Sequence, residues 1–272
     1  MTDFLVAALQ ITSTSNVEAN FAEAEEQIEL ASRRGAELIG LPENFAFLGE
    51  DNEKLRMASE LSTKCTNFLK TMSQRYQVFL LGGGYPVPAG DDRHTFNRSA
   101  LFGKDGSILA KYDKIHLFDA DVSDTNRRYR ESDDFSRGNR PVVFDSPWGR
   151  IGLAICYDLR FPELFLHFAH NRVSIILIPS AFTEATGRDH WEILLRARAI
   201  ECQCFIVAPN QGGCHNEKLN TWGRSMVVDP WGNILSSLDK GEGVVVADLD
   251  LSMIQKICDR MPIASHRRFN VS

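Results

Sequence analysis

The sequence predicts an α/β fold with mixed sheets. Near the N-terminus, a continuously apolar run, a segment with helical spacing and a second apolar run follow one another, which is the strand, helix, strand order of layered α/β proteins. Further along, three pairs of strand-like runs are joined by short turn sequences, which indicate antiparallel strands. The chain has 272 residues, 43% of them hydrophobic, and no linker or low-complexity tract, so we expect one domain over residues 1–272.

The first strand, helix, strand unit is the clearest. Phe4–Leu9 is apolar without alternation, which is typical of a central strand that is buried on both faces. Ser15–Glu18 has the form of a capping box, and apolar residues then recur at helical spacing as far as Gly35. Leu38–Leu41 resembles a second buried strand, which stops at Pro42.

Two later buried strands end in the same way. Ile175–Ile178 runs into Pro179, and Phe205–Ala208 runs into Pro209. Proline cannot donate a hydrogen bond to the next strand, so it ends the pairing and releases the chain into a loop. Open α/β sheets usually place their ligands at such loops. The loops after Pro42, Pro179 and Pro209 are therefore candidate borders of one cleft.

Antiparallel hairpins are predicted at three places. Their turns are Asp105-Gly106, Asp145–Gly149 and Asp229–Gly232. The flanking strands are Ser99–Phe102 with Ile108–Ala110, Val142–Phe144 with Ile151–Ile155, and Met226–Val228 with Ile234-Leu235. Between the last two hairpins, a helix is predicted from a cap near Asp189 to Ile200.

Composition and charge exclude several classes of partner. The formal net charge is -6 and there is no basic run, so we expect no nucleic-acid partner. No apolar stretch approaches the roughly 18 residues of a membrane span, so we expect no membrane partner. Met1-Thr2-Asp3 is acidic where a signal peptide would be basic, so we expect a cytoplasmic protein. Most of the six cysteines should then be free thiols, and their spacing predicts no structural metal.

Cys156 is the best candidate nucleophile. It follows the predicted strand Ile151–Ile155 and precedes a helix start at Phe161-Pro162, so it falls at a strand-to-helix turn. A thiol there can lie near a helix N-terminus, which favours the thiolate. An ordinary buried cysteine is the alternative, because free cysteine is among the most buried residue types.

A carboxylate and a lysine are candidate partners of this thiol. None of the seven histidines is an obvious base for a cysteine hydrolase. Glu43 comes directly after a strand and a proline, and Lys114 lies just beyond the predicted strand Ile108–Tyr112. Taken alone, either residue is more often a solvated surface charge.

Three segments resemble the signature segments of the nitrilase superfamily of carbon–nitrogen hydrolases. They are Leu41–Asn44, Lys111–Leu117 and Gly152–Leu164, and they occur in the superfamily's order. The resemblance covers essentially the whole chain. It implies an αββα sandwich with mixed sheets, which pairs with a second copy into a four-layer αββααββα homodimer. It implies no cofactor and no metal.

The resemblance also implies roles for particular residues. Glu43, Lys114 and Cys156 match the catalytic triad, with Cys156 forming a thioester and Glu43 acting as base and then as acid. Lys114 and the backbone N–H of Tyr157 are expected to stabilise the tetrahedral oxyanion. Glu131 lies where the family carries a second glutamate, which is proposed to position the lysine or the substrate.

Within the superfamily, the sequence is most similar to the deaminated glutathione amidase branch. This likeness implies hydrolysis of a small, carboxylate-bearing amide into 2-oxoglutarate and cysteinylglycine, as metabolite repair. The alternatives are an ω-amidase acting on 2-oxoglutaramate, another small aliphatic amidase, and a catalytically silent binding protein. The segments that carry the likeness are Pro179–Phe182, His190–Glu192, Leu195–Glu201 and Met226–Gly232.

A carboxylate-bearing substrate needs a cation in the pocket, and Arg160 is the candidate. It lies four residues beyond Cys156, and arginine offers bidentate geometry to a carboxylate. The alternative is a structural ion pair of Arg160 with Glu163 or Glu192.

Overall fold

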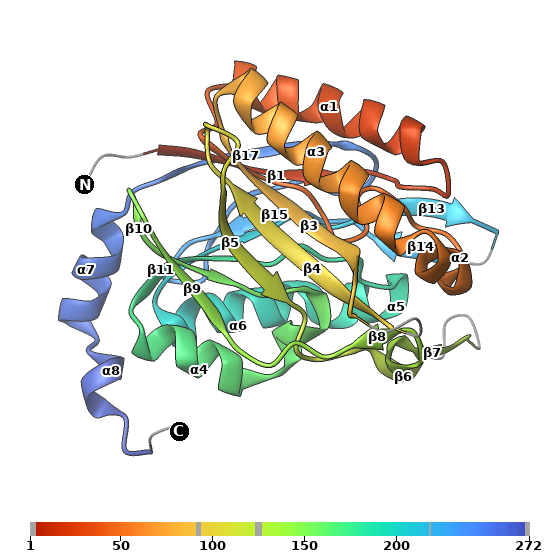
Figure 1. Ribbon diagram of the computed structural model, residues 1–272. Helices are drawn as coiled ribbons and strands as arrows, with labels where there is room; N and C mark the ends of the chain where they lie inside the picture. The colour runs from red at the N-terminus through yellow and green to blue at the C-terminus, as the bar shows by residue number, and fades with distance from the viewer. Residues whose placement is uncertain (1–3, 91–93, 123–126, 218, 270–272) are drawn as a thin grey trace.

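The computed structural model describes residues 4–90, 94–122, 127–217 and 219–269. Met1-Thr2-Asp3, from which the lack of a signal peptide was argued, lies outside these ranges. Two large sheets stack face to face, and helices cover their outer faces (Figure 1). This is the αββα sandwich that the resemblance implies, with mixed sheets as the hairpins predict.

The first sheet contains the N-terminal half of the chain and one late strand. β1 is parallel to β2, and β2 is parallel to β3, while the flanking strands are antiparallel to their neighbours. The strands in spatial order are β17 (Gly243–Leu249), β1 (Phe4–Gln10), β2 (Leu38–Gly40), β3 (Phe79–Pro88), β4 (Thr95–Phe102) and β5 (Ile108–Asp113), with β8 (Phe135–Ser136) beside β4.

The second sheet repeats this arrangement. β10, β11 and β12 are parallel, and antiparallel strands flank them on both sides. Read from β9, the sequence of parallel and antiparallel pairs is the same as in the first sheet read from β17. The strands in spatial order are β9 (Val142–Ser146), β10 (Gly149–Leu153), β11 (Val173–Leu177), β12 (Phe205–Ala208), β15 (Met226–Val228) and β16 (Ile234–Ser237).

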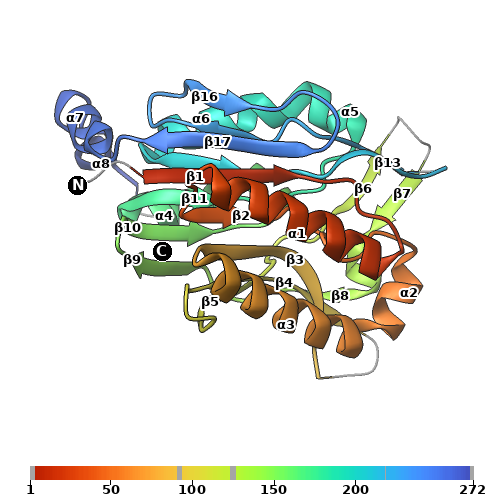
Figure 2. The same cartoon turned by 90° about the horizontal axis from the view of Figure 1, so that it is seen from above.

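The helices form the two outer layers. α1 (Val17–Arg33) and α3 (Ala58–Tyr76) cover the first sheet, and α4 (Pro162–His170) and α6 (Glu192–Cys202) cover the second (Figure 2). The inner faces of both sheets share one core that includes Val6 and Ile176. A separate core joins α1 and α3 to the first sheet.

The structure corrects two predicted helix starts. Asn16 rather than Ser15 caps α1, because its side chain accepts the Ala19 N–H at 3.1 Å. The helix predicted from Asp189 begins as α6 at Glu192, after a π-helical turn, η3 (Gly187–Trp191). Asp189 therefore lies within that turn and does not cap the helix.

Smaller elements gather at one end of the sandwich. Two hairpins and two short helices lie there in Figure 1. They are β6 (Asp119–Val122) with β7 (Arg127–Arg130), β13 (Gly212–Asn216) with β14 (Leu219–Trp222), α2 (Asp51–Arg56) and α5 (Glu184–Thr186). At the other end, α7 (Ser252–Arg260) and α8 (Ile263–His266) project from the body (Figure 1).

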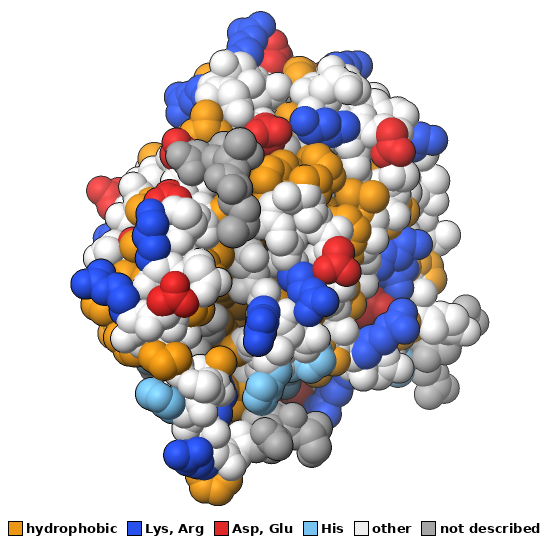
Figure 3. All heavy atoms as spheres, turned by 90° about the vertical axis from the view of Figure 1, so that its left-hand side faces the viewer, with side chains coloured by type: hydrophobic (Ala, Val, Ile, Leu, Met, Phe, Trp, Pro, Cys, Tyr) orange, Lys and Arg blue, Asp and Glu red, His pale blue; other side chains and the backbone are white. Residues whose placement is uncertain are grey.

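The charges on one face, the helices and the cysteines can be described directly. On the face shown in Figure 3, cationic and anionic side chains are interspersed, without a continuous basic area. Within the described ranges, no helix is long and apolar enough to cross a membrane. All six cysteines are free thiols.

Candidate active site

Three proline-ended strands bring their loops together, as the sequence suggested. The Ser180 N–H donates to the Pro209 carbonyl oxygen at 2.9 Å, and Ser180 and Asn210 form a parallel bridge. The Gln211 side-chain amide donates to the carbonyl oxygen of Glu43 at 3.1 Å. The loops after β2 and β11 therefore line the cavity that contains Cys156, whereas the loop after β12 packs against both of them without lining it.

Cys156 lies at a strained turn in this site. β10 ends at Leu153, and the 3-10 turn η2 (Cys156–Arg160) begins at the cysteine itself, before α4. The backbone of Cys156 has φ +47, a left-handed conformation that is uncommon for a residue with a side chain. Its N–H is held by the Pro179 carbonyl oxygen at 3.0 Å. Such strain is typical of functional positions, where the surroundings hold the residue in place.

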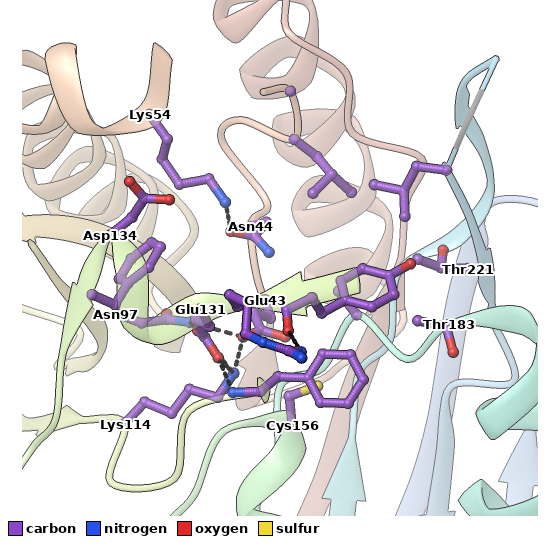
Figure 4. A pocket seen from close by; sticks show the side chains of 18 residues that line it. Glu43, Asn44, Lys54, Asn97, Lys114, Glu131, Asp134, Cys156, Thr183 and Thr221 are labelled. Atoms are coloured by element: carbon purple, nitrogen blue, oxygen red, sulfur yellow. Dashed lines mark hydrogen bonds and ion pairs between the residues drawn. The ribbon is translucent and has the colours of Figure 1, made fainter. Parts of the chain in front are cut away.

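Glu43, Lys114 and Glu131 form one buried cluster. The ammonium Nζ of Lys114 lies 3.0 Å from Glu43 Oε1 and 2.8 Å from Glu131 Oε2. Lys114 and Glu43 are 2% and 3% exposed. Figure 4 shows the side chains of Glu43 and Glu131 meeting the end of Lys114, beside Cys156. Beyond the effect of burial, Glu43 raises the pKa of the Cys156 thiol, and the backbone N–H of Ala181 lowers it.

The charged groups in the cluster shift one another's pKa values. Burial opposes ionisation of Glu43, but the Lys114 ammonium holds the pKa of this carboxyl below its ordinary value of 4.5. Burial also disfavours the Lys114 ammonium, but the carboxylates of Glu131 and Glu43 raise its pKa well above 10.5. Burial, and then the Glu43 charge, raises the pKa of Cys156 well above 9.0. This shift favours the protonated thiol over the thiolate that the sequence led us to expect.

Asn97 on β4 is a site residue that the sequence did not predict. Its amide donates to Glu43 Oε1 at 2.8 Å and to Glu131 Oε1 at 3.2 Å, so it fixes both carboxylates relative to each other. Glu131 also accepts the Phe118 N–H at 2.7 Å. No local signal marks Asn97 in the sequence, because its strand also contains the polar residues Arg98 and Ser99.

Asp158 joins the lysine loop to the cysteine loop. This carboxylate is fully buried and accepts hydrogen bonds from the Tyr112 hydroxyl at 2.7 Å and from the Ile155 N–H at 2.9 Å. It also accepts the His116 N–H at 3.0 Å and lies 2.7 Å from Nδ1 of that ring. Because Tyr112 and His116 flank Lys114, Asp158 fixes the lysine relative to Cys156.

Tyr157 and Arg160 lie beside the cavity that contains Cys156. Tyr157 follows the nucleophile in η2, and its ring packs on Phe118. Arg160 does not line this cavity but an adjoining hollow, and Phe118 lines both. The guanidinium lies over the rings of Tyr157 and Phe182 and 3.2 Å from His190 Nδ1. The structure therefore gives Arg160 these rings and His190 as partners, rather than Glu163 or Glu192.

The cavity contains further charged and polar groups. Lys54 from α2 and Arg130 from β7 line it, together with Asp134. The remaining lining side chains are mostly apolar or uncharged and include Leu48, Phe135, Leu219, Thr183 and Thr221. A small organic molecule with more than one polar end matches this lining.

The comparison with known families identifies the chain. The family model described as carbon-nitrogen hydrolase matches residues 5–258. This chain belongs to the carbon-nitrogen hydrolase family. The resemblance of the three segments to this family is thereby confirmed. The protein is a hydrolase that acts on amides, which disfavours a silent binding protein.

Similar proteins agree with this assignment. A Synechocystis protein named deaminated glutathione amidase is 46% identical over 272 residues, which are 99% of this chain and 100% of that protein. Saccharomyces cerevisiae Nit3, described as a member of branch 10 of the nitrilase superfamily, superposes with a TM-score of 0.88 at 30% identity, over 98% of this chain and 97% of Nit3.

A Nesterenkonia amidase of similar structure has an active-site cysteine. A point mutant of that enzyme superposes with a TM-score of 0.80 at 25% identity, covering 97% of this chain and 98% of that chain. That structure is described as showing the Michael addition of acrylamide at the active-site cysteine.

Proposed function

We propose that this amidase hydrolyses deaminated glutathione to 2-oxoglutarate and cysteinylglycine, as a metabolite-repair reaction. The observation that carries the proposal is the contact between Cys156, Glu43 and Lys114 in one cavity. The full-length similarity to a relative that is named for this substrate supports the choice of amide.

The first half-reaction forms a thioester on Cys156. The Glu43 carboxylate accepts the thiol proton as the sulfur attacks the amide carbonyl carbon. The negative charge that develops on the carbonyl oxygen is stabilised by the Lys114 ammonium and the Tyr157 N–H. When the C–N bond breaks, Glu43 returns its proton to the departing nitrogen, and the amine leaves.

The second half-reaction uses the same carboxylate. Glu43 accepts a proton from water as the water oxygen attacks the thioester carbon, and the proton returns to the sulfur as the C–S bond breaks. The acid is released and Cys156 is a thiol again. Glu131 and Asn97 keep Lys114 and Glu43 in place throughout, because each bonds to a member of the pair.

Arg160 is the proposed partner of the carboxylate on the 2-oxo acid side. Its hollow shares Phe118 with the Cys156 cavity, and we propose that an acyl chain on the sulfur extends past this ring toward Arg160. Arginine binds carboxylates through two parallel hydrogen bonds. In this arrangement the acyl part of the substrate lies toward Arg160 and the amine part lies toward Glu43.

The test compares two amides by mass spectrometry. We expect the wild type to release cysteinylglycine and 2-oxoglutarate from deaminated glutathione in preference to ammonia from 2-oxoglutaramate. Cys156→Ala should abolish both reactions because it removes the nucleophile. Cys258→Ala, which removes a thiol on α7, is the matched control and should keep activity. A preference for 2-oxoglutaramate would assign the protein as an ω-amidase, and turnover by Cys156→Ala would refute the nucleophile.

We also propose that residues 1–272 act as one carbon–nitrogen hydrolase domain that forms a homodimer. Ile193 and Ile200 lie about two turns apart on one face of α6 and are 69% and 45% exposed, and Trp231 is 52% exposed. A second copy packed on α6 would cover the two isoleucine side chains. A cytoplasmic location stays a prediction from the sequence.

A further inference from the structure

Lys54 is a buried cation in the active-site cavity that the mechanism does not use. It comes from α2 and is 5% exposed, although lysine is among the residues least often buried. Its ammonium lies 3.2 Å from Asn44 Oδ1 and 5.5 Å from the centre of the Phe135 ring. Figure 4 shows the Lys54 side chain extending to Asn44 at one end of the cavity, while Thr183 and Thr221 lie at the other.

The position of Lys54 relative to Glu43 indicates which part of a substrate it meets. Glu43 must reach the departing nitrogen to protonate it, so the amine part of the substrate passes Glu43. Asn44 is the next residue, held in a left-handed conformation with its N–H bonded to the Gly84 carbonyl oxygen at 2.7 Å. Its side chain contacts Lys54, which places the ammonium next to the residue that follows Glu43.

Two other cations line the cavity, and each is held by groups of the protein. The Arg130 guanidinium is bonded to the Tyr129 carbonyl oxygen at 2.6 Å and to Asp121 at 3.0 Å. Lys114 is held between Glu43 and Glu131. Asp134 also lines the cavity, so a substrate carboxylate binds best where the Lys54 ammonium is nearer to it than the Asp134 carboxylate.

We propose that Lys54 binds a carboxylate at the far end of the amine product, so that the enzyme selects amides whose amine part is an amino acid or peptide. This proposal rests on the proposed function and extends it to the second end of the substrate. Arg160 and Lys54 then bind two carboxylates on opposite sides of the scissile bond. An amide that releases ammonia has no group for Lys54.

The experiment pairs a change in Lys54 with a change in the substrate. The substrates are deaminated glutathione and the same molecule with its glycine carboxylate replaced by a carboxamide, and the readout is 2-oxoglutarate release. A charge-assisted hydrogen bond stabilises by about 1.5–3 kcal/mol, so we expect the wild type to prefer the carboxylate by roughly 10- to 100-fold in kcat/KM, mainly through KM. In Lys54→Met this preference should fall to near unity.

Two further variants separate carboxylate binding by Lys54 from the general effect of removing a lysine. Lys64→Met removes an exposed lysine that pairs with Glu18 and Glu60 on the surface, and it should keep the wild-type preference. Lys54→Arg keeps the charge and should keep part of the preference. If Lys54→Met does not fold by thermal melting, the wild-type preference and the Lys54→Arg preference still test the proposal.

The outcomes distinguish this proposal from the proposed function. A wild type that cleaves both substrates equally, or a Lys54→Met enzyme that keeps the wild-type preference, would overturn the role of Lys54 and leave the amidase assignment intact. A wild type that releases ammonia from 2-oxoglutaramate but does not cleave deaminated glutathione would overturn the proposed function itself, and Lys54 selection with it.

Discussion

At the scale of single residues, the buried charges of the site are paired with opposite charges. Lys114 lies between two carboxylates, and Asn97 bonds to both of them. The short motifs around Glu43, Lys114 and Cys156 could be recognised from sequence because each motif consists of residues that are adjacent in the chain. Asn97 could not, because only the pairing of its strand places the amide between two carboxylates that lie far apart in the chain.

The direction of the Glu43 pKa shift predicts the pH dependence. Because this pKa is below 4.5, Glu43 stays an acceptor at neutral and mildly acidic pH. The pKa values of Lys114 and Cys156 are both raised, so neither changes charge there. We expect kcat/KM to be flat from about pH 5 to 8 and to fall only below pH 4.5, as Glu43 becomes protonated.

Folding has to be followed in the same pH series. A carboxyl whose folded pKa is lowered adds stability above its unfolded pKa, and this stability is lost as the pH falls through the folded value. Far-UV circular dichroism therefore has to show a folded protein across the acidic limb. An acidic limb with its midpoint near about pH 6 to 7 in folded protein would contradict the assignment of Glu43 as the base.

At the scale of elements, periodicity and turn residues predicted the buried strands, the hairpins and the helix α1, although not its cap at Asn16. It did not predict β3 as one strand through Gly82–Gly84, because glycine lacks strand propensity. The reason for these glycines is a close approach that the sequence does not record. A Cβ on Gly83 would lie 2.0 Å from the Pro42 carbonyl oxygen, so the glycine allows the turn that carries Glu43 to pack on β3.

Gly83→Ala tests this close approach. The atom that the new Cβ would meet belongs to the backbone and cannot turn aside, so we expect a loss of about 2 kcal/mol or more in the free energy of unfolding. Displacement of Glu43 should also lower kcat. Gly243→Ala is the matched control on β17, where the nearest atom is the end of the Leu238 side chain at 3.0 Å. Urea unfolding in which the two variants are equally stable would contradict the packing argument.

At the scale of the whole molecule, the site belongs to neither sheet alone. Glu43 and Lys114 follow strands of the first sheet, and Cys156 follows a strand of the second. Asp158 bonds across this division to Tyr112 and His116. The sequence predicted that three proline-ended loops border one cleft but could not show how the sheets stack. The sandwich was expected from the family resemblance alone. A periodic pattern indicates which residues are buried, but it does not indicate which buried faces pack together.

The exposed face of α6 carries the prediction of a homodimer. If a second copy covers Ile193 and Ile200, the double variant Ile193→Asp with Ile200→Asp should lower the solution mass from that of two chains to that of one, because it buries unpaired charges in the contact. Leu30→Asp, on the helix layer of the other sheet, is the control and should not change the mass. Light scattering of a wild type with the mass of one chain would refute the dimer.

The most direct test of the account is the covalent state of Cys156 during turnover. The wild type is mixed with deaminated glutathione, quenched with acid and digested, and the peptide that contains Cys156 is weighed by mass spectrometry. We predict a mass increase equal to one 2-oxoglutaryl group on Cys156, which disappears as the substrate is exhausted and is absent from Cys156→Ala. Steady release of 2-oxoglutarate without any acyl group on Cys156, together with turnover by Cys156→Ala, would contradict the thioester mechanism.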